Sequence, residues 1–134
     1  MTKLADIEGI GSVYARKLKK AGIRSVGSFL EKGATPKDRK AIAAASGIGP
    51  RLILEWVNHA DLFRIKGVGG EYADLLEEAG VDTVVELSKR DPKVLYRKLL
   101  KLNATRKLVR RLPAAKQVAS WVRQAKKLPR RISY

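Results

Sequence analysis

The feature that most constrains this chain is an internal duplication. The stretch Ile7-Glu8-Gly9-Ile10-Gly11 returns 58 positions later as Ile65-Lys66-Gly67-Val68-Gly69. Over residues 7–30 and 65–88, nine of 24 aligned positions are identical. A repeat of this length indicates two copies of one supersecondary unit, so we expect two related halves.

Each copy carries a glycine, an apolar residue and a second glycine, followed by small and apolar residues at helical spacing. This pattern predicts a tight turn that enters a helix, because glycine adopts the positive φ angles of such turns. The apolar residue, Ile10 in the first copy, can point back into the core. The first N–H groups of the following helix lack partners within that helix, and such donors suit a phosphate oxygen.

These residues resemble the helix-hairpin-helix motif of DNA-binding proteins that do not read sequence. The matching positions are Gly9, Ile10, Gly11, Ala15 and Leu18 in the first copy, and Gly67, Val68, Gly69, Ala73 and Leu76 in the second. A third candidate is Ser46-Gly47-Ile48-Gly49-Pro50-Arg51, in which Ile53 replaces the expected small residue. Nearly the whole chain is also similar to a family of tandem helix-hairpin-helix proteins catalogued only as a domain of unknown function. That likeness includes residues 52–58, 60–62, 80–84 and 110–113.

The expected fold is all-α, with two tandem helix-hairpin-helix repeats over residues 1–61 and 62–134. Each repeat would comprise a hairpin, a connector helix and a second hairpin. The fourth hairpin is expected to be degenerate, because Leu112-Pro113-Ala114 stands where the two glycines belong. In the second repeat we expect helices over residues 92–102 and 106–111, a turn at residues 103–105, and a last helix opened by Pro113. Trp56 and Trp121 are expected in the core.

Charge is the second strong constraint. The net charge is +16, and no acidic residue follows Asp91, whereas 14 lysines and arginines do. Such a field attracts polyanions. A merely solubilising basic surface is the alternative interpretation.

The two copies differ in charge on the helix that follows the turn. The first has Arg16, Lys17, Lys19 and Lys20, where the second has Asp74, Leu75, Glu77 and Glu78. Glu71 also follows the glycines of the second copy. Because a carboxylate there competes with a phosphate and repels it, we expect the first copy to be the main contact. The acidic helix with Glu71, Asp74, Glu77 and Glu78 is expected to meet basic helices in this chain or in a neighbouring copy.

We therefore predict binding to the phosphate backbone of nucleic acid, with duplex DNA as the expected target and no base reading. The predicted contacts are Gly9, Gly11, Ser12, Val13, Arg16, Lys17, Lys20, Gly47, Gly49 and Arg51. A secondary basic surface comprises Arg106, Lys107, Arg110, Arg111, Lys116 and Arg123. The resemblance also implies a K⁺ or Na⁺ ion at the carbonyls of Ala5, Ile7 and Ile10. No other metal or cofactor is expected.

Two alternatives to duplex DNA stay open from the sequence. The fold could serve as a protein–protein scaffold with changed partners, and structured RNA would suit the same basic surface as DNA. Catalysis is not expected, because Asp61 is an isolated carboxylate and no set of catalytic side chains is apparent. The chain has no cysteine and no long apolar run. We expect a cytoplasmic protein without membrane contact, nucleoid-associated or nuclear if it binds DNA.

Overall fold

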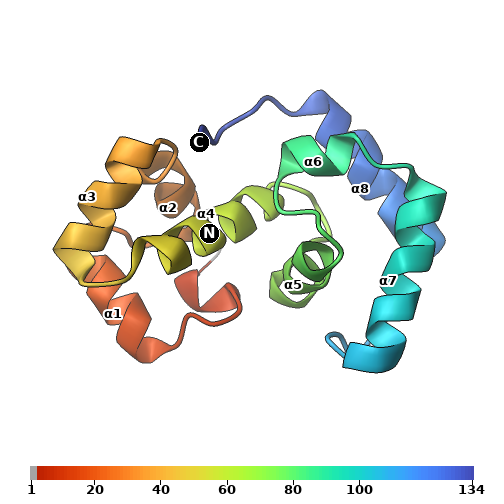
Figure 1. Ribbon diagram of the computed structural model, residues 1–134, viewed down its shortest axis with the longest axis horizontal. Coiled ribbons are helices and arrows are strands. Elements are labelled where there is room, and N and C mark those ends of the chain that lie inside the picture. Colours follow the sequence, from red (N-terminus) through yellow and green to blue (C-terminus); the bar gives the residue numbers. More distant parts are fainter. Residues whose placement is uncertain (1–2) are drawn as a thin grey trace. The chain divides into compact units, whose positions relative to one another are not determined.

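The computed structural model describes residues 3–134, and within that range the only regular structure is helical (Figure 1). The predicted all-α class is therefore confirmed. In chain order the helices are the 3-10 helix η1 (Leu4–Asp6), α1 (Ser12–Lys20), α2 (Val26–Lys32), α3 (Pro36–Ser46), α4 (Pro50–Leu62), α5 (Gly70–Glu78), α6 (Val84–Ser88), α7 (Pro92–Arg106) and α8 (Ala115–Lys127).

Four helices begin at side-chain caps that are readable in the sequence. Ser25 and Thr35 accept hydrogen bonds from backbone N–H groups in the first turns of α2 and α3, and Thr83 does so for α6. Asp91 accepts from the amides of Lys93 and Val94 at the start of α7. A side-chain acceptor at this position satisfies N–H groups that have no partner within the helix.

The chain divides into two compact units. The first comprises the residues up to Asp61 together with Arg131–Tyr134, and the second comprises Leu62–Arg130. In the first unit α1 contacts η1 and α3. In the second unit α8 packs against α6 and α7, and α5 packs against α7; Figure 1 shows α7 and α8 in blue tones beside each other.

The last four residues belong to the first unit, so the predicted second repeat over residues 62–134 is wrong at its end. Ile132 is buried, and the Ser133 amide donates a 2.8 Å hydrogen bond to the Ala34 carbonyl. The Tyr134 hydroxyl donates to Asn58 Oδ1 at 2.9 Å. These contacts fix the tail to the first unit.

Arg39 on α3 holds this tail. It is only 6% exposed, and its guanidinium donates to the Gly33 carbonyl at 2.9 Å and to the Ser133 carbonyl at 2.8 Å. Burial lowers the pKa of Arg39, and the nearby Tyr134 partly offsets this effect. When the helix starts Pro36 and Pro92 are aligned, the counterpart of Arg39 in the second unit is the buried Leu95. The same position is therefore apolar and buried in the second unit, and a polar contact to the tail in the first.

The predicted turn at residues 103–105 and the predicted helix over residues 106–111 are both wrong. Helix α7 continues through Arg106 and ends at Lys107, which has a left-handed φ of 50°. Asn103, in the last turn of α7, accepts a hydrogen bond from the Val109 amide at 2.9 Å and donates to the Val109 carbonyl. The following residues therefore fold back onto the helix end, where Val109 is buried.

We predict that Arg39→Leu, which introduces the residue of the second unit, destabilises the protein. It leaves the carbonyls of Gly33 and Ser133 without their guanidinium donors, which costs about 1–3 kcal/mol for buried groups. Urea denaturation measures this loss, and faster hydrogen exchange at the Ser133 amide would locate it. The exposed neighbour Lys40, changed to Ala, is the control and is expected to stay within about 0.5 kcal/mol of the parent. Unchanged stability and exchange in Arg39→Leu would contradict the role given to Arg39.

Candidate nucleic-acid interface

The glycine turns of the two copies have the same backbone geometry. Gly9 has a φ of 92° and Gly67 a φ of 95°. The amide of Ile10 donates to the Ile7 carbonyl at 3.2 Å, and its counterpart Val68 donates to the Ile65 carbonyl at 3.1 Å. Both middle residues are buried, at 4% and 6% exposure, so each turn is held by its apolar side chain as the sequence predicted.

A tryptophan packs on the first glycine of each turn. A Cβ atom added to Gly9 would lie 3.5 Å from Trp56 Nε1, and one added to Gly67 would lie 3.2 Å from Trp121 Nε1. The ring centroids of Tyr14 and Trp56 are 5.1 Å apart, and the corresponding tyrosine–tryptophan pair of the second unit has a separation of 5.2 Å. Both tryptophans are buried, which confirms their predicted core position.

The start of α1 is open to a ligand. Gly11 precedes the helix, has no capping side chain, and accepts the Ala15 amide at 3.0 Å. The amides of Ser12, Val13 and Tyr14 come before this first helical hydrogen bond. A Cβ atom at Gly11 would meet nothing within 4 Å, and Val13 is 54% exposed. A phosphate group therefore has room to approach these donors.

The predicted basic contacts beside this turn all lie at the surface. Arg16, Lys17 and Lys20 project from α1 as exposed side chains. Lys17 Nζ lies 5.8 Å from the centroid of the Tyr14 ring. Arg16 lies in the middle of α1, and Lys17 and Lys20 lie in its last turn. These three cations therefore make the whole helix surface positive, which attracts an anion to it.

The turn between α3 and α4 is similar in its glycines and its buried middle residue, but the Ile48 amide donates to Ser46 Oγ at 3.2 Å and not to a backbone carbonyl. Gly47 has a φ of 73°, Ile48 is 3% exposed, and the Gly49 carbonyl accepts the Ile53 amide at 3.2 Å. A Cβ atom at Gly49 would meet nothing within 4 Å, and Arg51 in the first turn of α4 is exposed. The first unit thus contains two glycine turns that open onto helix starts with cations nearby.

The second unit keeps the backbone of the turn and changes its charge. Gly69 accepts the Ala73 amide at 2.9 Å, and a Cβ atom at Gly69 would meet nothing within 4 Å. The exposed Glu71, however, lies in the first turn of α5. The carboxylate repels a phosphate at the same helix start that would otherwise attract it.

One acidic residue of α5 meets a basic helix of the same unit. Glu78 accepts from Arg106 Nη1 at 2.8 Å, with both side chains partly exposed. The charge of Arg106, which belongs to the predicted secondary basic surface, is therefore partly neutralised. The other members of that surface, Lys107, Arg110, Arg111, Lys116 and Arg123, are exposed.

The fourth turn has lost the open geometry. Pro113 is buried at the position of the apolar middle residue, and α8 begins at Ala115 rather than at Pro113 as predicted. The Ala114 amide donates to Gln117 Oε1 at 2.8 Å, so a side chain covers the start of this helix. No positive φ occurs between Pro113 and Ala115.

The carbonyls named for a monovalent cation are partly engaged. The Ile7 carbonyl already accepts the Ile10 amide at 3.2 Å, which uses one of its lone pairs. The ion at Ala5, Ile7 and Ile10 stays a prediction.

Two cations that bond the glycines after the ends of α1 and α5 were not predicted from the sequence. Lys32 Nζ donates to the Gly22 carbonyl at 2.8 Å, and Arg90 donates to the Gly80 carbonyl at 3.0 Å. Each glycine lies just after the end of the helix that follows the glycine turn. The internal repeat could have revealed them, because Lys32 and Gly22 recur as Arg90 and Gly80 with the same displacement of 58 positions as the glycine turns.

The family described as "Domain of unknown function (DUF4332)" matches residues 8–128. The chain belongs to the DUF4332 family. No curated protein and no solved structure matches it. In the described part of this DUF4332 chain, residues 3–134, no helix is long and apolar enough to cross a bilayer.

We predict unequal effects on stability for the same substitution at the two glycines of the first turn. Gly9→Ser forces a side chain into a positive-φ conformation against Trp56 and should cost about 1–3 kcal/mol of unfolding free energy. Gly11→Ser should change stability by about 0.5 kcal/mol or less, because serine is a good N-cap residue and the site is open. Chemical denaturation of both variants measures the difference. Equal losses would contradict the roles given to the two glycines.

Proposed function

We propose that this protein binds nucleic acid through the phosphate backbone, with duplex DNA as the target and the first unit as the contact. The observation that carries the proposal is the pair of open glycine turns in that unit, at Gly11 and Gly49. Each precedes a helix start that a Cβ atom would not obstruct. Several exposed cations follow Gly11 on α1, and one exposed cation, Arg51, follows Gly49 on α4.

The physical basis is the chemistry of helix starts. Backbone N–H groups there point outward, and the helix dipole adds a partial positive charge. Arg16 and Lys17 beside Gly11, and Arg51 beside Gly49, would supply full charges to the same phosphates. Contacts of this kind position a protein on nucleic acid and carry no sequence information, so binding should be independent of base sequence.

The second unit supports this assignment because its turn has the same backbone geometry as the turn at Gly11 but carries the opposite charge beside it. Gly69 has the same environment as Gly11, yet Glu71 follows it in the first turn. The turn at Gly69 is therefore expected to contribute little to binding even though its backbone is equivalent.

The test compares Gly11→Val with its matched control Gly69→Val in titrations of a fluorescently labelled 20-base-pair duplex. Gly11→Val places a branched side chain where the phosphate would approach and should weaken binding by at least about tenfold, as expected for lost hydrogen bonds to a charged group. Gly69→Val should bind as the parent does. Circular dichroism would verify that both variants are folded.

The outcomes separate the competing functions. Equal binding by parent and Gly11→Val would mean that charge alone is responsible. Tighter binding to an RNA duplex of the same sequence would identify structured RNA as the target. No binding to either duplex at low salt would contradict the proposal and favour a protein partner.

A second prediction concerns salt. Each phosphate contact contributes about 0.9 to the slope of log affinity against log salt concentration. Replacing Arg16 and Lys17 together by Gln should therefore reduce that slope by about 2. The charge-matched control replaces the exposed Lys126 and Lys127 by Gln. A slope reduced equally by both double variants would show that no local phosphate contact exists at α1.

A further inference from the structure

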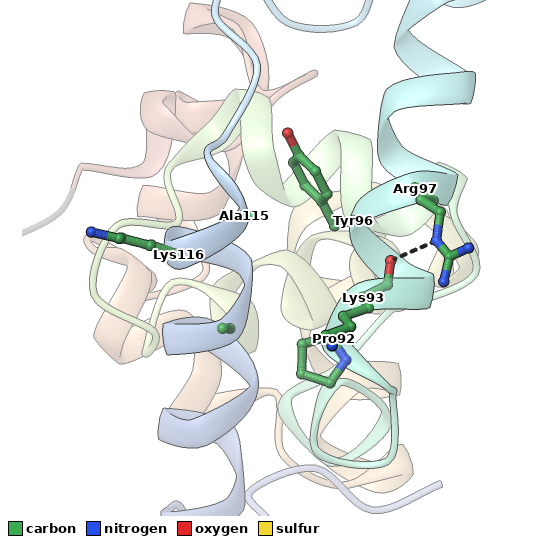
Figure 2. A pocket seen from close by; sticks show the side chains of 7 residues that line it. Pro92, Lys93, Tyr96, Arg97, Ala115 and Lys116 are labelled. Carbon is green, nitrogen blue, oxygen red and sulfur yellow. Dashed lines mark hydrogen bonds between the residues drawn. The ribbon is translucent and has the colours of Figure 1, made fainter.

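The second unit contains a hollow between the N-terminal parts of α7 and α8. Its volume is about 580 Å³. Figure 2 shows the lining side chains, with the Tyr96 ring between the two helices. The lining residues are Pro92, Lys93, Tyr96, Arg97, Ala115, Lys116 and Ala119.

Two of the residues that line the hollow, Tyr96 and Ala119, differ in size and chemistry from their counterparts in the first copy. When Trp56 and Trp121 are aligned, Ala119 stands where the first copy has Leu54. When Pro36 and Pro92 are aligned, Tyr96 stands where the first copy has Lys40. The second copy thus has a small side chain in place of a large one, and an aromatic ring in place of a flexible cation.

The chemistry of the hollow combines an aromatic ring with a cationic rim. Tyr96 is half-buried, and the neighbouring alanines and Pro92 add apolar surface. Lys93, Arg97 and Lys116 are exposed at its edges. In Figure 2 Lys116 extends outward from α8, and Arg97 turns back so that its Nε lies 3.5 Å from the Lys93 carbonyl.

Acidic side chains do not compensate this charge on the two helices. No aspartate or glutamate follows Asp91 in the sequence. Asp91 itself accepts the amides of Lys93 and Val94 as the cap of α7. A fitting ligand therefore has a flat apolar body and negative charges next to it.

We propose that this hollow binds a nucleobase of unpaired nucleic acid, which stacks on Tyr96 while the flanking phosphates contact Lys93, Arg97 and Lys116. The proposal extends the proposed function to a second site and to single-stranded segments such as overhangs. A volume of about 580 Å³ lies in the range of small-molecule sites and accommodates a ring system. Stacking on an aromatic side chain tolerates any base, which agrees with a protein that does not read sequence.

The test uses Ala119→Leu, which fills the hollow with the side chain of the first copy and leaves every charge unchanged. The probes are a labelled blunt duplex and the same duplex with an eight-nucleotide thymidine overhang. The parent should bind the overhang duplex about tenfold more tightly than the blunt one, in the range expected for stacked bases. Ala119→Leu should lose this preference and keep its affinity for the blunt duplex.

Three further variants make the test decisive. Tyr96→Leu removes the ring without filling the hollow and should lose the same preference, so the proposal does not depend on Ala119→Leu folding correctly. Ala104→Leu, the same substitution at an exposed position of α7, should keep it. Gly11→Val should weaken blunt-duplex binding and retain the overhang preference, which distinguishes failure of this site from failure of the proposed function.

The contradicting results are specific. A preference retained by both Ala119→Leu and Tyr96→Leu, or absent in the parent, would overturn the proposal. Binding of an acidic peptide in the hollow would also overturn the proposal. In that case the probe Glu-Glu-Trp-Glu-Glu would bind the parent but not Ala119→Leu, and octathymidylate would not displace it.

Discussion

In each unit, a buried tryptophan packs on a glycine whose φ is positive. Trp56 meets Gly9 in the first unit, and Trp121 meets Gly67 in the second. The tryptophan comes from the last long helix of the unit and the glycine from its first turn, so this contact joins the beginning of the unit to its end. A tyrosine on the helix after the turn contacts the same ring. A side chain at either glycine would be strained by the positive φ, and at Gly67 its Cβ would also crowd Trp121 Nε1 at 3.2 Å.

This shared framework has allowed the surfaces of the two units to differ. The turns, the buried tryptophans and the cations that bond Gly22 and Gly80 recur in both copies. The side chains around them do not. Arg16 corresponds to Asp74, which changes the charge beside the turn, and Leu54 corresponds to Ala119, which opens a hollow. The same supersecondary unit can therefore carry two different sites, because function depends on the side chains placed on a fold.

Local signals explain what the sequence could predict. Thr35-Pro36 and Asp91-Pro92 mark helix starts because capping depends on residues three or four positions apart. The turn glycines and the buried tryptophans follow from the repeat and from helical spacing. The candidate contacts on α1 and α4 were also readable, since exposure of Arg16 or Arg51 follows from the polar face of an amphipathic helix. Their role in binding stays a prediction.

Long-range contacts explain what the sequence could not predict. Arg39 and Ser133 are 94 positions apart, and nothing near Arg39 indicates that a tail will cover it. Asn103 has a weak helix propensity, yet its side chain bonds Val109 and lets α7 continue through Arg106. The hollow at Ala119 is a missing volume, which becomes visible only when α7 and α8 lie side by side.

The most direct test of the central claim is an amide chemical-shift titration of the ¹⁵N-labelled protein with a short DNA duplex at moderate salt. The account predicts the largest shifts at the amides of Ser12, Val13 and Tyr14 and in the first turn of α4, with small shifts at the equivalent amides of α5. Shifts confined to the basic C-terminal helices, with the two turns of the first unit unaffected, would contradict it.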